Sequence, residues 1–334
     1  MKQPKGPSGF IVVDKPAGIT SFDVIRELRR LTGIRKLGHS GVLDKPATGV
    51  LVIGANNATR LFELFTHFEK EYTADFWFGL TTNTDDLSGE LDGTGDCSGV
   101  TRGEFEETMA EYTGTIDQIP PAFSLTKKGG KELYRYALAG EAVEVTPKRV
   151  TILDSTLDAW ESGVAPAEAV AEGSRLAEHL GSLPPLIRAL VRLRCIGGVY
   201  VRCLARDIGA DLGCYGALGS LVRTRVGPFL LDDAWSLDAI SRAMDTEKGL
   251  SGILLPLSAV SPDESRMQLD PQQLGMVRNG QSIRRFKQHL PPAATKRGDL
   301  VYGMDPGHDL AVILTVQGVN QHGLVELRPT KVLA

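Results

Sequence analysis

The sequence predicts a mixed α+β body over residues 1–260, followed by a small all-β module over residues 265–334. The chain has 334 residues, which is enough for one large domain with a sizeable core and an appendage. In the body, short apolar runs alternate with helical patterns, and glycine and proline turns separate them. After Pro256 the pattern changes to short strands between Gly, Pro and Asn turns, which is typical of an all-β module.

The elements of the body follow the period of their apolar residues, two for a strand and about 3.6 for a helix. Capping residues place the helix ends, for example Thr20 or Ser21 before one apolar face and Gly33 after it. We expect strands at 10–13, 50–53 and 72–78. Helices are expected at 20–33, through 61–65, and at 102–112, 133–138 and 201–212. A further strand and a glycine turn should precede the helix at 201–212.

Two stretches of the body differ from this regular pattern. Residues 120–145 form a basic, Pro- and Gly-punctuated excursion that suits a mobile binding loop. Residues 161–186 are rich in Ala, Glu and Gly, and we interpret them as a surface insertion with a helix at about 167–180, entered through Pro166.

The composition excludes several classes of protein. With 42% hydrophobic and 23% charged residues the chain is typical of a globular protein. No run approaches the roughly 18 apolar residues of a membrane span, and the run at 10–13 is too short for a signal-peptide core. The four cysteines form no CxxC pair and the six histidines are scattered. We therefore expect a cytoplasmic protein with free thiols, no metal site and no membrane contact.

The net charge of -4 gives no overall electrostatic signature of nucleic-acid binding, so an RNA-binding surface must be local. Three clusters of basic residues are candidates, although each alone is typical of a solvated helix face. They are Arg26, Arg29, Arg30, Arg35 and Lys36; Lys127, Lys128, Lys131 and Arg135; and Arg202, Arg206, Arg223 and Arg225.

The segment GHSGVLDKPATGVLVIG, residues 38–54, places Asp44 between glycine-bracketed turns and a buried strand. Pro46 restricts the residue before it and Gly49 lets the backbone turn, so a rigid loop would present the carboxylate. Locally, two interpretations stay open: an Asx-turn that only shapes the loop, or an active carboxylate.

The same segment resembles the aspartate motif of the TruB family of tRNA pseudouridine synthases, usually G-H-x-G-x-L-D-P-x-A-T-G-V-L. Four more blocks resemble that family in the same order: GFIVVDKPAGITSFDVI, KEYTADFWFGLTTNTDD, QIPPAFS with KKGGKELYRYALAG, and GGVYVRCLARDIGADLG. The blocks span roughly residues 9–230. The C-terminal module resembles a PUA-type RNA-binding domain, more in its strand pattern than in its motifs.

The resemblance implies a fold and a reaction. The fold is a mixed, mainly antiparallel sheet of the pseudouridine synthase type. The reaction isomerises a uridine, number 55 of the tRNA T loop, after the base flips out of its stack. The N1–C1′ bond breaks and the base is rejoined through C5, with no redox change or net hydrolysis. No cofactor is therefore implied, the partner is the T arm of tRNA, and we expect a monomer that needs no protein partner.

The resemblance also assigns residues. Asp44 matches the nucleophile, and Arg202 matches the arginine that favours the charged carboxylate, lowering its pKa by roughly one to three units. Tyr72 matches a tyrosine that stacks on the base or helps to move the C5 proton. Arg206, one turn after Arg202, is expected to be a surface charge. Residues that match substrate-contact positions are His39, Asp86, Leu221, Lys127, Lys128, Lys131, Tyr134 and Arg135.

The chain departs from the family pattern at three positions, and other functions stay open. Lys45 stands where proline usually follows the aspartate, Leu125 replaces a small residue, and Leu138 replaces an arginine. A non-catalytic RNA-binding or tRNA-chaperone protein would use the basic clusters without Asp44. A guide-dependent synthase would need partners and guide RNA, and a nucleoside hydrolase-like enzyme would release free uracil.

Overall fold

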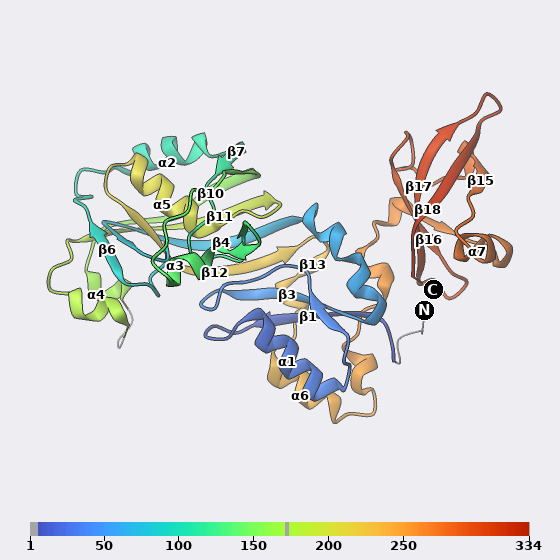
Figure 1. The fold of residues 1–334 in the computed structure, drawn as a ribbon, viewed down its shortest axis with the longest axis horizontal. Coiled ribbons are helices and arrows are strands. Elements are labelled where there is room, and N and C mark those ends of the chain that lie inside the picture. Colours follow the sequence, from blue (N-terminus) through green and yellow to red (C-terminus); the bar gives the residue numbers. More distant parts are fainter. Residues whose placement is uncertain (1–5, 171–173, 334) are drawn as a thin grey trace.

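The computed structural model describes residues 6–170 and 174–333, and two separate sheets organise them (Figure 1). The larger sheet has nine strands and crosses the body of the molecule. The smaller sheet has five strands, all drawn from residues 266–332, and lies at one end of the molecule in Figure 1. This arrangement agrees with the expected body and C-terminal module.

The larger sheet is mixed and mainly antiparallel, as predicted. Its strands follow the order β1-β3-β12-β4-β11-β10-β7, with β2 paired to β3 and β13 paired to β12. The neighbours β3 and β12 run parallel, whereas the other described pairs of this sheet are antiparallel. The strands are β1 (Gly9–Lys15), β2 (Leu37–His39), β3 (Thr48–Ala55), β4 (Glu69–Phe78), β7 (Gly114–Gln118), β10 (Lys148–Val164), β11 (Leu186–Ile196), β12 (Gly216–Val226) and β13 (Phe229–Leu230).

Helices cover the two ends of this sheet (Figure 1). At one end, α1 (Ser21–Thr32) and α6 (Leu237–Met244) pack their apolar sides on β1 and β3. At the other, α2 (Arg102–Glu111) and α5 (Val201–Asp211) pack on β4 and β11. The body also contains the helix α3 (Leu133–Leu138), the 3₁₀ helices η3 (Leu231–Asp233), η4 (Gly249–Gly252) and η5 (Leu257–Val260), and two strand pairs. The pairs are β5 (Leu80–Thr82) with β6 (Leu91–Thr94), and β8 (Lys127–Lys128) with β9 (Lys131–Glu132); η6 (Asp263–Ser265) follows the body.

The predicted ends of the first helix are confirmed. The Thr20 side chain accepts a hydrogen bond from the Asp23 amide and the Asp23 carboxylate accepts one in return, which completes a capping box. Gly33 ends the helix in the left-handed conformation, with φ 70°. The pattern expected to give a helix through residues 61–65 forms a 3₁₀ helix instead, η1 (Asn56–Thr66).

The insertion differs from its prediction. The prediction of a single helix at about 167–180 was wrong. Helix α4 (Pro166–Ala169) ends where Val170 becomes extended, and η2 (Arg175–His179) is a separate 3₁₀ helix. Residues 171–173 lie outside the described residues. Val170, which caps α4, and Leu176 of η2 are buried beside Trp77 and Leu80, so burial of apolar groups sets the local conformation here.

The smaller sheet follows the order β14-β16-β17-β18-β15 and carries the α-helix α7 (Pro271–Arg278), which the prediction of an all-β module did not include. Tyr302 and Met304 share an apolar cluster with Phe10 and Phe65, so this sheet packs on the body beside β1 and η1. Its elements are β14 (Arg266–Gln268), β15 (Ile283–Phe286), η7 (Lys287–His289), β16 (Leu300–Met304), β17 (Leu310–Val319) and β18 (Leu324–Val332).

Two properties of the whole fold bear on the expected class of protein. The four cysteines are free, buried thiols, as expected. Within residues 6–170 and 174–333, no helix combines the length and apolar character needed to cross a membrane.

Candidate active site

Asp44 lies in the loop between β2 and β3, and buried contacts fix this loop. The Ser21 hydroxyl donates to the Leu43 carbonyl at 3.1 Å and accepts from the Leu43 amide at 2.9 Å. The Ala47 amide closes a turn onto the Asp44 carbonyl at 3.1 Å. At Gly49, φ is 96° and a Cβ would lie 2.3 Å from the Arg223 carbonyl oxygen, so only glycine fits. The loop is therefore rigid, as predicted.

Lys15 also holds this loop, and sequence reasoning missed it. Its side chain is fully buried, and its ammonium donates to the carbonyls of Pro16 at 2.9 Å, Lys45 at 3.3 Å and Ala47 at 2.6 Å. Burial lowers the pKa of Lys15 to about 8, although the nearby Asp44 acts in the opposite direction. The available signal was a lysine that ends an apolar strand directly before Pro16.

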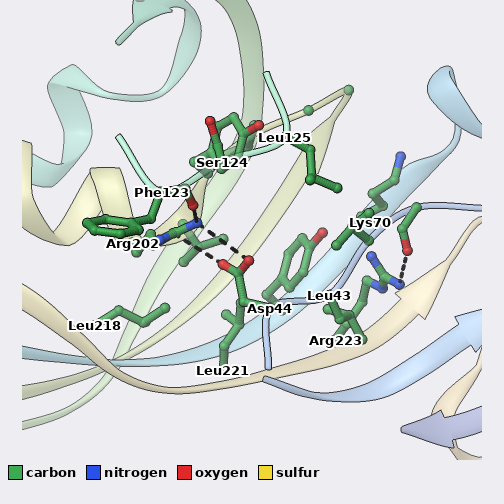
Figure 2. A pocket seen from close by; sticks show the side chains of 18 of the residues that line it. Leu43, Asp44, Lys70, Phe123, Ser124, Leu125, Arg202, Leu218, Leu221 and Arg223 are labelled. Carbon is green, nitrogen blue, oxygen red and sulfur yellow. Dashed lines mark hydrogen bonds and ion pairs between the residues drawn. The ribbon is translucent and has the colours of Figure 1, made fainter. Parts of the chain in front are cut away.

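Arg202 reaches Asp44 from the start of α5, 158 residues along the chain (Figure 2). Its Nε lies 3.2 Å from Oδ2 of Asp44, and its Nη2 lies 3.5 Å from Oδ1. The guanidinium also donates to the carbonyls of Thr84 at 2.9 Å and Phe123 at 2.8 Å. The Arg202 side chain is 5% exposed and that of Asp44 41% exposed, so a nearly buried cation faces an accessible carboxylate.

The pKa of Asp44 is raised, which differs from the expected direction. Burial among protein atoms raises it most, and the charge of Asp86 adds to this effect. Arg202 lowers the Asp44 pKa, as predicted, and Lys15 also lowers it, but together they do not outweigh burial. Asp44 is therefore a more basic carboxylate than an exposed aspartate, and the charges of Arg202 and Lys15 favour its ionised form.

A cavity of about 430 Å³ opens beside the ion pair, within the roughly 300–1,000 Å³ typical of ligand sites. Figure 2 shows Asp44 and Arg202 on one wall and Leu218 and Leu221 below them. Asp44, Tyr72, Tyr134, Arg202, Leu221 and Arg223 all line this cavity, together with Lys70, Phe123, Ser124, Leu125 and Val42. Residues from six separate segments thus converge on one opening, including the three predicted catalytic residues and two of the eight predicted substrate contacts.

Tyr72 comes from β4, opposite Arg223 of β12 in the strand register. Burial raises the pKa of the Tyr72 phenol, and the charge of Arg223 only partly opposes this. A neutral phenol is a poor proton acceptor, so Tyr72 offers the cavity an aromatic face and a hydroxyl rather than a base. Arg223 donates to the carbonyls of Val50 at 2.8 Å and Gly41 at 3.3 Å, and so ties β12 to the Asp44 loop.

Six of the predicted substrate contacts lie outside the cavity lining, His39 and Asp86 among them. His39 ends β2 and is half-buried, and burial with the charge of Arg223 lowers its pKa, so its ring is neutral near pH 7. Asp86 accepts hydrogen bonds from Thr84 Oγ1 at 2.9 Å and from the Ser88 amide at 2.9 Å, which caps its own loop. Their contact with a substrate stays a prediction.

The basic excursion forms the β8–β9 hairpin and the helix α3, which places Tyr134 at the cavity. Acidic neighbours offset several of its charges: Lys127 and Arg135 lie 3.9 and 3.0 Å from Glu132, and Lys131 lies 3.0 Å from Glu141. Lys128 is exposed and has no ion-pair partner within residues 6–170 and 174–333. In the same part of the chain, no three His, Cys, Asp or Glu side chains are grouped to hold a metal.

Comparison with known families identifies the family of this chain. The model of the TruB family pseudouridylate synthase N-terminal domain matches residues 29–172, and that of the tRNA pseudouridylate synthase B C-terminal domain matches residues 202–260. A tRNA pseudouridine synthase B of Cutibacterium acnes is 40% identical over 77% of this chain and 82% of its own length. The chain belongs to the TruB family. It is accordingly a pseudouridine synthase, an isomerase.

Further similarities extend over nearly the whole length of this TruB-family chain. A tRNA pseudouridine synthase B of Mycobacteroides abscessus is 36% identical over 98% of this chain and 99% of its own length. The fold is similar to a solved chain of an H/ACA ribonucleoprotein bound to a substrate RNA containing 2′-deoxyuridine. That chain has a TM-score of 0.67 at 20% identity, with coverage of 98% of this chain and 85% of the other.

Proposed function

We propose that this protein isomerises uridine to pseudouridine in tRNA, at position 55 of the T loop, with Asp44 as the nucleophile. The Asp44–Arg202 ion pair at the wall of a cavity carries the proposal, since it puts an accessible carboxylate beside a space for one base. The relatives named tRNA pseudouridine synthase B supply the substrate class.

The reaction needs a nucleophile that stays charged where water is scarce. Asp44 attacks the target nucleotide at C1′ or at the base, the N1–C1′ bond breaks, and the base turns. A bond from C5 to C1′ then forms, Asp44 leaves, and the proton on C5 is lost while N1 gains one. Arg202 stabilises the carboxylate whenever Asp44 is free, and Tyr72 lines the path of the rotating base with an aromatic face.

The RNA would approach from the basic excursion. Lys127, Lys128, Lys131 and Arg135 would meet phosphates of the T arm, and Tyr134 would meet the flipped nucleotide at the cavity. We assign the catalytic domain to residues 1–260 and an RNA-binding domain to residues 265–334. The protein would act as a monomer in the cytoplasm, without a guide RNA or protein partner.

One experiment tests the function directly. Purified protein alone is incubated with an unmodified tRNA transcript, and pseudouridine is mapped at single-nucleotide resolution. We expect one site, position 55. Free uracil would indicate a hydrolase, tRNA remodelling without pseudouridine an RNA chaperone, and a requirement for guide RNA a guide-dependent synthase.

The variant Asp44→Asn tests the nucleophile in the same assay. It keeps the size and most hydrogen-bonding capacity of the side chain but removes its charge, so tRNA binding should persist while turnover disappears. Appreciable pseudouridine formation by Asp44→Asn would refute the role of this carboxylate.

A further inference from the structure

Helix α5 carries a second arginine one turn after Arg202, and it bridges the same two segments of the body. Arg202 donates to the Thr84 carbonyl at 2.9 Å and to the Phe123 carbonyl at 2.8 Å. Arg206 Nη1 donates to the Asp85 carboxylate at 3.0 Å, and its Nη2 donates to the Ile119 carbonyl at 3.3 Å. The segment 82–86 and the segment 119–123 are thus each tied to α5 twice.

The Arg206–Asp85 pair is not a surface charge, so the expectation for Arg206 was wrong. The Arg206 side chain is 28% exposed and that of Asp85 only 13% exposed. Arg206 Nε also donates to Asp207 at 2.8 Å, so the guanidinium has acceptors for all three of its nitrogens. Burial raises the pKa of Asp85 and Arg206 opposes this, so removal of the guanidinium would leave a poorly solvated carboxylate.

Asp85 occupies an unusual backbone conformation, which links its side chain to Arg202. Its φ is 63°, in the left-handed region that aspartate tolerates better than most residues but at some cost in energy. The peptide between Thr84 and Asp85 carries the carbonyl that accepts from Arg202. Leu218 donates its amide to the Asp85 carbonyl at 3.0 Å, so the next peptide is fixed as well. Loss of the side-chain ion pair would release the strained residue and turn this carbonyl.

Arg202 depends on these carbonyls for its position, because Asp44 alone holds it loosely. The 3.2 Å approach of Nε to Asp44 lacks the alignment of a hydrogen bond, and the Nη2 contact is long at 3.5 Å. The two backbone contacts at 2.9 and 2.8 Å are the well-formed ones. Phe123 also lines the cavity, so a shift of its segment would change the cavity itself.

We propose that Arg206 and Asp85 are positioning residues that keep Arg202 directed at Asp44. The inference rests on the proposed function, because it concerns the orientation of the cation that serves this nucleophile. Neither residue touches the substrate; both act through the carbonyls of Thr84 and Phe123.

The test compares Arg206→Gln, Arg206→Lys and Asp85→Asn with the wild type and with a control, Arg192→Gln. Arg192 forms an exposed ion pair with Asp158 at 2.7 Å, so its variant removes a guanidinium from the surface of the same sheet. Each protein is assayed for kcat on a tRNA transcript across pH 5–9, for tRNA Kd, and for thermal unfolding.

For Arg206→Gln we expect kcat to fall about 10- to 100-fold, the range for a misplaced catalytic group, while Kd changes little. The acid limb of the kcat profile should move to higher pH, because Asp44 loses part of the cation that lowers its pKa. Asp85→Asn should shift the limb in the same direction. Arg206→Lys keeps the positive charge but lacks the planar guanidinium, so its kcat should lie between that of Arg206→Gln and that of the wild type. Arg192→Gln should match the wild type.

Two results would overturn the inference: an unchanged kcat in a folded Arg206→Gln, or a lower kcat with an acid limb that does not move. If Arg206→Gln unfolds, the smaller change Asp85→Asn decides by the same two criteria. Wild-type protein that forms no pseudouridine would instead contradict the proposed function, and Asp44→Asn in the same assay separates the two failures.

Discussion

Replacing Lys15 with methionine should leave stability nearly unchanged and still remove most of the activity. Lys15 is fully buried, and its ammonium holds the Asp44 loop through three carbonyl oxygens. The Lys45 carbonyl keeps a second donor, the Gly18 amide at 2.9 Å, and Pro16 is exposed enough for water to replace the ammonium. Only the Ala47 carbonyl, which accepts the shortest bond, is left buried without this donor.

These contacts set the size of the stability change. Leaving the buried Ala47 carbonyl without a donor costs about 1–3 kcal/mol, and replacing the ammonium by water at the Pro16 carbonyl costs about 1 kcal/mol. The lost hydrogen bonds together lower the free energy of unfolding by roughly 2–4 kcal/mol. Against this, a pKa lowered from 10.5 to about 8 means that burying the charge costs about 3 kcal/mol at pH 7. Methionine relieves that cost, so the two effects nearly cancel.

The effect on turnover does not cancel. With the Ala47 carbonyl free, the turn that presents Asp44 loosens, and a displacement of about 1 Å costs about 100-fold in rate. We therefore expect kcat to fall about 10- to 100-fold while the free energy of unfolding in urea changes by less than about 2 kcal/mol at pH 7.

The pH dependence of stability supplies an independent check on Lys15. Between pH 8 and 10.5 the unfolded chain holds the lysine proton and the folded chain does not, so this group makes the wild type more stable as pH rises. Lys15→Met lacks that contribution, so the wild type should gain stability relative to it over this window. A loss of more than about 4 kcal/mol at pH 7, or no relative gain at high pH, would refute the reasoning.

Three further predictions follow from the site. Asp44→Asn should be more stable than the wild type at pH 7, because the raised pKa of Asp44 means that the folded wild type loses stability as the pH rises through that pKa. In urea titrations the stability difference between variant and wild type should vanish near pH 3, and a variant less stable than the wild type at pH 7 would contradict the direction of the pKa shift. Tyr72→Phe should retain tRNA affinity, whereas Tyr72→Ala should lose about 1–3 kcal/mol of it from missing stacking, and equal Kd values for the two would exclude that role. Lys127→Gln with Lys128→Gln should weaken tRNA binding and reduce the slope of log Kd against log salt by up to about 2, and an unchanged slope would place the phosphates elsewhere.

The central pair of the site could be predicted from sequence, because motifs carry it. Asp44 and Arg202 lie 158 residues apart, and no periodicity relates them; the resemblance of two separate blocks to one family does. The same resemblance implied the mixed sheet. The caps of α1 were accessible as well, because Thr20 and Gly33 act through local geometry that the sequence shows directly.

Residues whose state depends on tertiary burial could not be predicted in the same way. Lys15 and Arg206 look like ordinary surface charges in sequence, and only the folded chain encloses them with acceptors from distant loops. The direction of the Asp44 pKa shift was mispredicted for the same reason. The motifs showed its cation partner Arg202, which lowers the pKa, but they did not show the extent of burial, which raises it more.

Burial of these charges explains why the site uses so many backbone carbonyls. A cation that met only Asp44 would saturate the carboxylate and hold it away from a substrate. Arg202 instead directs its well-formed hydrogen bonds at Thr84 and Phe123, and Lys15 directs its own at Ala47 and Pro16. Both cations are thus fixed by neutral acceptors, and their charge acts on Asp44 without a tight bond that the reaction would have to break. Asp44 can stay charged by proximity to these cations and still move onto the nucleotide, because its side chain is the accessible member of the pair.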